Sequence, residues 1–206
     1  MIADALRGVH ASRTLEVGPG DGVWTDLIIP KTDSLTLLDQ SEEMIKRAQE
    51  RLAKENPSIT FVHSDFAEYQ PEAPFDLICG IRCFEYFEDQ AKAVKKMYSI
   101  LNPGGQLVIV TKNPAHIHNK QSQQRELHVG QISKKAMIQL LESEGFTVTK
   151  VLSATFRIKA RHAIMRGVAR MIQGAHVASG GFIRIPYITN AFTESYIYVA
   201  KRNDVK

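Results

Sequence analysis

A glycine-rich turn and an acidic residue on the next strand are the groups with the clearest chemistry in this sequence. Apolar residues lead into Gly18, Gly20 and Gly22, and a second apolar run ends in Asp39. A backbone without Cβ atoms can approach a ligand closely and can adopt positive φ. The carboxylate at the tip of the second strand can accept hydrogen bonds from two vicinal ribose hydroxyls. Together these groups predict an adenosine-containing cofactor at the carboxyl edge of a parallel sheet.

The spacing of the glycines narrows the class of cofactor. A dinucleotide-binding fingerprint would place its third glycine where this chain has Val23. The pattern Glu-x-Gly-x-Gly-x-Gly, which starts at Glu16, instead resembles the first motif of class I S-adenosylmethionine-dependent methyltransferases. The spacing therefore disfavours a nucleotide-binding oxidoreductase.

Four further segments carry the same resemblance in the expected order. They are Asp65-Phe66, the stretch Phe75–Arg82, the turn Leu101–Gly105 and the pair Gly145-Phe146. With the glycine turn they cover about residues 13 to 150, and they are similar to the small-molecule branch of the family. The resemblance implies an α/β, Rossmann-like, doubly wound fold. Its seven-stranded sheet would be mostly parallel, with an antiparallel last strand and a helical insertion before that strand.

The cofactor implied by this resemblance is S-adenosyl-L-methionine. Glu16 and the Gly18–Gly20 backbone would face its methionyl end, Asp39 its ribose, and Asp65 with Phe66 its adenine. The full set of residues implied as cofactor-binding is Glu16, Gly18, Pro19, Gly20, Asp39, Gln40, Asp65, Phe66, Gly80, Ile81 and Arg82.

Simpler structural roles stay open for several of these positions. Asp39 could cap the helix that begins near Ser41, and Asp65 could cap a turn. Gly22 could serve only close packing between a helix and a strand. Met44, which lies at helical spacing, is more typical of a core residue than of a residue that flanks adenine.

Catalytic candidates follow from what methyl transfer needs. Transfer from a sulfonium requires alignment of donor and acceptor, and it requires a base only where the acceptor must lose a proton. The candidate catalytic residues are His128 and Glu85, in loops expected at the carboxyl edge of the sheet. Tyr86, His116 and His118 fall in the same loops. A structural or solvent-facing loop residue is the alternative for each of the five.

Two other reactive groups suggest chemistry that their neighbours do not support. His116 and His118 lack a third ligand at convincing spacing, so no metal site is predicted. Cys83 follows Arg82, whereas some cytosine methyltransferases have a proline before their nucleophilic cysteine. We expect Cys83 to be a packed small residue.

Alternating strand-like and helix-like segments must position these residues. Strands are expected at Thr14–Val17, Ser34–Leu38, Thr60–His63, Phe75–Cys79, Gln106–Thr111, Thr147–Ser153 and Ser195–Ala200. Helices are expected to open at Val23–Ile29 and to span Ser41–Lys54, Ala91–Leu101 and Ser133–Ser143, with a turn at Asn102–Gly105. Strands that alternate with helices imply a parallel sheet covered on both faces.

The composition is typical of a soluble protein of one domain. The 206 residues are 44% apolar and 23% charged. No apolar run approaches the roughly 18 residues of a membrane span. With two cysteines and no secretory signal, a cytoplasmic location is expected. Only a short section precedes the first strand, so the chain either covers its site in another way than its relatives or is truncated.

A basic segment lies between the last two expected strands. No Asp or Glu occurs from Gly145 to Thr193, and the same stretch holds Lys150, Arg157, Lys159, Arg161, Arg166, Arg170 and Arg184. Residues at about 156–190 are expected to form a lid-like insertion in a single methyltransferase domain that spans 1–206. The arginines would contact an anionic or lipid-linked acceptor or a membrane surface. A core-packed helix with a solvated basic face is the alternative.

These observations predict an S-adenosylmethionine-dependent methyltransferase that acts by in-line displacement on a small or lipid-like acceptor. An RNA or protein methyltransferase is the alternative among enzymes. It is favoured by the basic segment but lacks an acceptor-specific motif, so nucleic acid is the less expected partner. A catalytically silent, cofactor-binding partner subunit is the alternative from a different class, and the intact cofactor positions argue against it.

Overall fold

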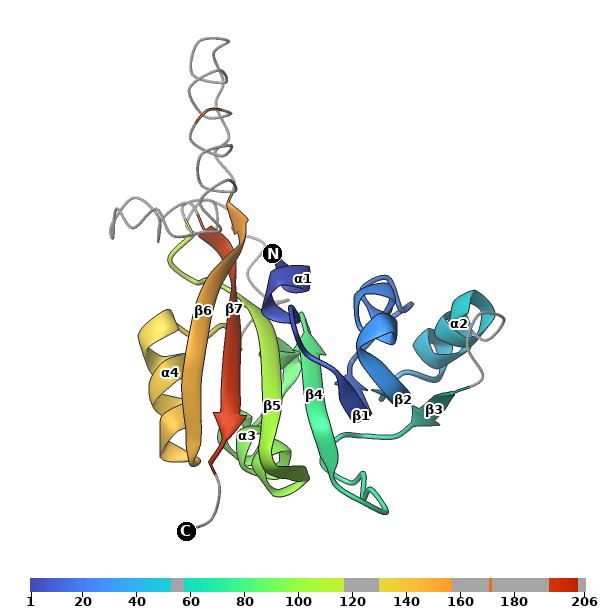
Figure 1. Ribbon diagram of the computed structural model, residues 1–206. Coiled ribbons are helices and arrows are strands. Elements are labelled where there is room, and N and C mark those ends of the chain that lie inside the picture. Colours follow the sequence, from blue (N-terminus) through green and yellow to red (C-terminus); the bar gives the residue numbers. More distant parts are fainter. Residues whose placement is uncertain (53–57, 117–129, 157–170, 172–192, 204–206) are drawn as a thin grey trace.

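One seven-stranded sheet with helices on both faces organises the chain (Figure 1). The computed structural model describes residues 1–52, 58–116, 130–156, 171 and 193–203. The strands are β1 (Ala11–Val17), β2 (Thr32–Asp39), β3 (Ile59–His63), β4 (Phe75–Ile81), β5 (Leu101–Lys112), β6 (Phe146–Phe156) and β7 (Thr193–Arg202). Their order across the sheet is β3-β2-β1-β4-β5-β7-β6.

The last strand gives the sheet its mixed character. β7 runs antiparallel to both of its neighbours, β5 and β6, while the other paired strands are parallel. The carboxyl ends of β1 to β6 therefore meet at the edge of the sheet where β7 begins. This topology confirms the predicted mostly parallel α/β sheet with an antiparallel last strand. The predicted helical insertion before β7 lies outside the described residues, apart from Met171.

Helices that each have one apolar and one polar face cover the sheet. α3 (Gln90–Ser99) and α4 (Lys134–Ser143) pack on one face, and α1 (Ile2–Ala5) and α2 (Glu42–Leu52) pack on the other. In Figure 1, α3 and α4 lie over the half of the sheet that holds β5 to β7, whereas α2 lies beside β2 and β3. Within the described part of the chain, no helix is long and apolar enough to cross a membrane.

Polar side chains fix where three of these helices begin. Asp89 and Ser133 each accept a hydrogen bond from the backbone N–H three residues further on, at 2.9 and 3.2 Å. Ser41 does the same for α2 at 3.4 Å. Such caps satisfy N–H groups that have no partner inside the helix. The predicted helix starts near Ser41 and Ser133 are confirmed.

The alternation of side chains along the strands creates two hydrophobic cores. Leu15 and Ile109 are fully buried against α3 and α4, while Leu77 and Val108 are fully buried on the opposite face. Central strands of this kind are covered on both sides and hold their loops at the sheet edges. The scaffold beneath the candidate site is therefore well packed.

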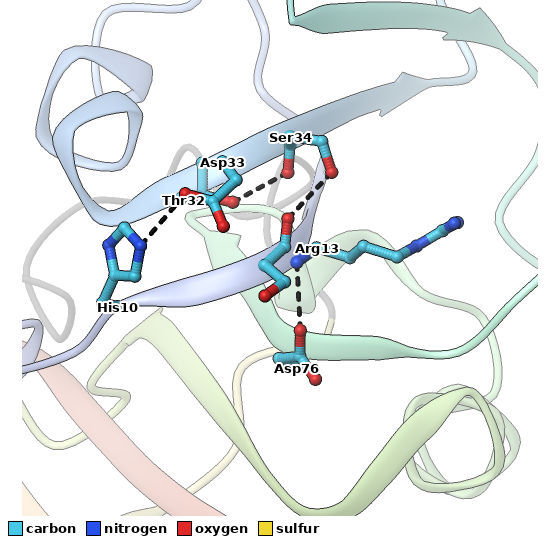
Figure 2. Close-up of polar contacts among 7 residues, drawn as sticks. His10, Arg13, Thr32, Asp33, Ser34 and Asp76 are labelled. Carbon is cyan, nitrogen blue, oxygen red and sulfur yellow. Dashed lines mark hydrogen bonds and ion pairs between the residues drawn. The ribbon is translucent and has the colours of Figure 1, made fainter.

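Polar contacts at the amino edge of the sheet tie together the starts of several strands (Figure 2). The Arg13 N–H donates to Asp76 Oδ2 at 3.0 Å, so β1 is joined to β4. His10 pairs with Asp33 at the start of β2 at 3.0 Å. These contacts lie at the opposite end of the strands from the glycine turn. They hold the scaffold rather than the site.

Two segments differ from the sequence prediction. The prediction of a helix that opens at Val23–Ile29 is wrong. The chain forms two short 3₁₀ helices there, Thr25–Leu27 and Ile29–Lys31. β-branched residues crowd this stretch, and Pro30 cannot donate the backbone hydrogen bond of an α-helix. The turn expected at Asn102–Gly105 forms the irregular start of β5, where the register against β4 is interrupted.

Candidate active site

The glycine turn joins β1 to the first 3₁₀ helix through left-handed residues. Gly18, Gly20 and Gly22 have φ of 64°, 59° and 80°. A Cβ at Gly18 would lie 2.5 Å from Cys83 Cβ, and one at Gly22 would lie 2.7 Å from Leu52 Cδ1. A Cβ at Gly20 would meet no atom within 4 Å. The turn therefore packs tightly at its two ends, as proposed for Gly22, and leaves open space beside Gly20.

Asp39, at the end of β2, is held against this turn. Its Oδ2 accepts a hydrogen bond from the Gly20 N–H at 3.1 Å, and its Oδ1 accepts one from the Ser41 N–H at 2.9 Å. The side chain stays partly exposed. Each carboxylate oxygen can accept a second hydrogen bond. The carboxylate thus stabilises the local backbone and keeps acceptor capacity for a ligand.

Glu16 lies beneath the turn. It is 1% exposed and pairs in register with Leu37 of β2 and Cys79 of β4. Its Oε2 accepts a hydrogen bond from the Thr25 hydroxyl at 2.7 Å. Burial raises the pKa of Glu16 to about 7, although the Thr25 hydrogen bond acts in the opposite direction. Glu16 therefore supports the turn from below through Thr25, and its contact with a cofactor stays a prediction.

Asp65 and Phe66 follow β3 at the same edge. Asp65 is exposed, and its Oδ1 accepts a hydrogen bond from the Ala67 N–H at 2.7 Å, as the turn-capping alternative requires. Phe66 is 5% exposed, and its ring centroid lies 5.5 Å from that of Phe87 in the hydrophobic core. A contact of Phe66 with adenine would therefore use its backbone.

Polar residues from several elements meet beyond β4. Arg82 Nη1 donates to Ser195 Oγ at 3.0 Å, and Arg82 Nε lies 3.4 Å from Glu85 Oε1. Glu85 is 4% exposed, and its Oε2 accepts a hydrogen bond from the Thr111 hydroxyl at 3.0 Å. We call Arg82, Glu85, Thr111 and Ser195 the edge cluster. It joins the exit of β4, the 3₁₀ helix Phe84–Tyr86, the end of β5 and the start of β7.

Cys83 connects the glycine turn to the exit of β4. Its Cβ fills the space beside Gly18, and its Sγ would lie 3.2 Å from a Cβ at Gly80. Burial raises the pKa of the Cys83 thiol well above its ordinary value, which disfavours the nucleophilic thiolate. Its surroundings agree with a packed small residue. The glycine turn and the edge cluster are thus adjacent parts of one region.

The remaining predicted residues lie around this region or outside the described chain. Pro19, Gly80 and Ile81 are buried in the turn and at the end of β4. Gln40 is exposed, and its carbonyl oxygen lies 3.1 Å from His63 Nε2. Met44 is partly buried in α2.

The remaining catalytic candidates are three histidines and Tyr86, and the structure describes only two of the four. His116 is buried in the turn after β5, where its N–H donates to the Asn113 carbonyl at 3.1 Å. Tyr86 is 59% exposed. His118 and His128 lie outside the described residues. Among the residues that are described, no group of three His, Cys, Asp or Glu side chains could hold a metal ion.

Sequence reasoning missed the hydroxyl residues that hold the charged groups. These are Thr25, Thr111 and Ser195. Ser195 is 113 positions from its arginine partner, so no local pattern could pair them. Each of them has a charged residue next to it, namely Asp26, Lys112 and Glu194, so no local signal marks them as buried partners of a charged group.

Comparisons with known proteins agree with this geometry. The family described as a methyltransferase domain matches residues 14–105. Malonyl-[acyl-carrier protein] O-methyltransferase 1 of Ilyobacter polytropus is 33% identical over 117 residues, which are 53% of this chain and 43% of that protein. Nodulation protein S of Rhizobium tropici is 33% identical over 119 residues, which are 56% of this chain and 50% of that protein.

A solved structure extends the likeness to the whole sheet. The N-methyltransferase NodS from Bradyrhizobium japonicum in complex with S-adenosyl-l-homocysteine superposes with a TM-score of 0.66 at 20% identity. The match covers 98% of this chain and 83% of NodS. This likeness shows a shared fold. In sequence, the chain spans about half the length of the curated relatives it matches.

Proposed function

We propose that this chain is an S-adenosylmethionine-dependent methyltransferase, because residues 14–105 match the methyltransferase domain family and the described sheet has the fold of solved methyltransferases. One observation supports the proposal most directly. The Gly20 backbone is open on the side where a Cβ would be, and its N–H is held by the Asp39 carboxylate. Residues 1–206 would form one domain around this site.

The residues present suit the cofactor. Gly20 offers a bare backbone for the methionyl end, and Asp39 has free acceptor capacity for ribose hydroxyls. Asp65 and the Phe66 backbone lie at the next loop of the same edge, where adenine would bind. When bound, S-adenosyl-L-methionine would supply an electrophilic methyl group.

The contribution of the protein is mainly alignment of donor and acceptor. Such positioning can lower a barrier by about 7–11 kcal/mol. Glu85 is buried and held by Arg82 and Thr111, so we assign it a role in orienting the edge cluster. His128, which lies outside the described residues, is the proposed base for an acceptor that must lose a proton.

We propose a small or lipid-like molecule as the acceptor. One relative supports this class, since its name states O-methylation of a malonyl group carried by an acyl-carrier protein. An RNA or protein acceptor, or a silent subunit, would be revealed by the same experiments. A screen with labelled methyl donor against isoprenoid, phenolic and lipid-linked compounds, RNA and protein would identify the class. Cofactor binding without transfer to any acceptor would indicate a silent subunit.

Cofactor binding tests the proposal first. We expect calorimetry to detect S-adenosylmethionine and S-adenosylhomocysteine but not NAD. Asp39→Ala should weaken the binding of S-adenosylhomocysteine at least about tenfold, because charge-assisted hydrogen bonds contribute about 1.5–3 kcal/mol each. Asp33→Ala, at the opposite end of β2, is the control and should leave the affinity unchanged. Tight NAD binding without either sulfur compound would overturn the assignment.

A glycine pair tests the location of the cofactor. Gly20 and Gly8 both have positive φ, of 59° and 73°, and a Cβ at either would meet no atom within 4 Å. Gly20→Ala and Gly8→Ala should therefore cost similar stability, on the order of 1 kcal/mol. Only Gly20→Ala should weaken the binding of S-adenosylhomocysteine, because the methyl group of the new alanine would enter the proposed site. Equal affinity in the two variants would contradict this placement.

A further inference from the structure

We propose that Arg82 recognises an oxyanion on the acceptor, so that the acceptor carries a carboxylate or a phosphate group. This inference rests on the proposed methyl transfer and names the chemical class of its acceptor. Three observations support it: the backbone of Arg82, the contacts of its guanidinium, and the charges around it.

The backbone of Arg82 is strained where the site is expected. Arg82 is the only non-glycine residue with positive φ in the described part of the chain, at 65°. It is the first residue after β4, and its N–H donates to the Val110 carbonyl at 2.8 Å. A left-handed conformation is costly for a residue with a Cβ, and such strain gathers at functional sites. Glycine would relieve it but would supply no guanidinium.

The guanidinium is oriented on one side and open on the other. Glu85 Oε1 lies 3.4 Å from Nε, and Ser195 Oγ accepts from Nη1 at 3.0 Å. A guanidinium has five N–H donors, and these contacts leave Nη2 without a partner among the residues that the structure describes. The Arg82 side chain is 34% exposed, whereas that of Glu85 is 1% exposed. A buried carboxylate thus fixes a cation whose remaining donors are available to a ligand.

A second cation lies beside this donor. Lys112 is opposite Ser195 in the register of β5 and β7. Burial, and next the positive charge of Arg82, lower the pKa of Lys112, although Glu85 and Glu194 act in the opposite direction. The positive charges of Arg82 and Lys112 are thus close enough to repel each other, and an oxyanion bound at Arg82 would lower that repulsion.

The position of Arg82 suits an acceptor rather than the ribose or adenine. Its neighbour Cys83 packs on Gly18, so the edge cluster adjoins the glycine turn on the β4 side. Asp39 and Asp65 lie on the other side of the turn, at the ends of β2 and β3. A planar guanidinium can bind a carboxylate or a phosphate through two parallel hydrogen bonds.

The test uses the full chain saturated with S-adenosylhomocysteine and small probes. Propionate, inorganic phosphate and neutral propionamide are titrated, and binding is followed by NMR shifts at constant ionic strength. We expect saturable binding of propionate or phosphate and none of propionamide. Tighter propionate would indicate a carboxylate acceptor, and tighter phosphate would indicate a phosphorylated one. Binding of all three probes alike, or of neither anion, would overturn the proposal.

The variant Arg82→Gly/Glu85→Gln removes both charges of the buried pair and relieves the strained backbone, so it should remain folded. It should bind the preferred anion at least tenfold more weakly. Its affinity for S-adenosylhomocysteine is measured beside this, because the resemblance also implies Arg82 as a cofactor-binding residue. Arg47→Gln/Glu43→Gln, which removes an exposed ion pair of α2 and likewise leaves the net charge unchanged, is the matched control. Thermal unfolding of each variant checks that the comparison is made on folded protein.

Two results of this comparison would count against Arg82. Unchanged anion affinity in the double variant would show that the guanidinium only joins β4 to β7. A loss of S-adenosylhomocysteine affinity without a loss of anion affinity would show that Arg82 binds the carboxylate of the cofactor. Absence of S-adenosylhomocysteine binding in the wild-type chain would instead contradict the proposed function itself.

Discussion

At the scale of single residues, Glu16 shows how one buried group can make the stability of the protein depend on pH. Among the described residues, its carboxyl group has one hydroxyl partner and no paired cation, so its charged form is poorly solvated. Its pKa is raised from 4.5 to about 7. The folded state therefore binds a proton that the unfolded state has already released over this range.

The Glu16→Gln variant tests this linkage. In the wild type, the stabilisation from the protonated carboxyl is fully present below about pH 4.5 and is lost as pH rises through about 7. At about 1.4 kcal/mol per pKa unit, the loss reaches about 3 kcal/mol. Urea unfolding between pH 5 and 8 should show this decline in the wild type. Glu16→Gln keeps an oxygen acceptor for Thr25 and should be more stable than the wild type at pH 8.

Glu50→Gln is the matched control, since Glu50 is an exposed residue of α2. It should follow the wild-type pH profile. A wild-type profile that Glu16→Gln does not alter would contradict the role assigned to the buried carboxyl.

At the scale of elements, the sequence predicted what local patterns determine. The positions of β2, β3 and α4 were predicted within one or two residues, because apolar periodicity and caps such as Ser133 lie within each segment. The prediction of a helix after the glycine turn was wrong, because the alternation of strands and helices suggested a helix where β-branched residues and Pro30 favour short 3₁₀ turns. The glycine turn and Asp39 were identified as a pair from two adjacent strands.

Gly130 shows an element whose position depends on a contact that no pattern reveals. A Cβ at Gly130 would lie 2.2 Å from the Glu85 carbonyl oxygen, which belongs to the 3₁₀ helix Phe84–Tyr86. Gln90 Nε2 donates to the Gly130 and Phe84 carbonyls, at 2.5 and 3.3 Å. The chain before α4 is therefore pressed against the short helix that carries Glu85.

The Gly130→Ala variant should displace this 3₁₀ helix. The new Cβ would overlap a backbone carbonyl, so the overlap cannot be relieved by a change of side-chain rotamer. We expect a loss of about 1–3 kcal/mol in urea unfolding, and amide NMR shifts that concentrate on residues 82–90. Gln90→Ala removes the hydrogen bonds without adding an atom, so it should cost stability with smaller shifts. Shifts of Gly130→Ala that are no larger than those of Gln90→Ala would contradict the steric account.

At the scale of the whole molecule, the edge cluster depends on completion of the sheet by its last strand. Ser195 comes from β7, and it reaches Arg82 only when β7 has inserted between β5 and β6. The sequence predicted β7 as an antiparallel strand but could not predict which residues it would bring to the site. Contacts between residues so distant in the chain are set by topology and packing rather than by local pattern.

Removal of β7 should therefore abolish the folded state and not only the edge cluster. The strand buries Tyr196 and Tyr198 in one core and Ile197 and Val199 in the other. At about 1.5–3 kcal/mol for each large apolar side chain, this burial is comparable with the 5–15 kcal/mol that stabilises a typical domain. β6 would also lose the neighbour to which it is hydrogen-bonded.

A chain ending at residue 192 should show no cooperative thermal transition by circular dichroism and no binding of S-adenosylhomocysteine. A chain ending at Asn203 keeps β7 and should unfold as the full chain does. A cooperative transition in the shorter chain, close to that of the full chain, would show that the sheet is stable without its antiparallel strand β7.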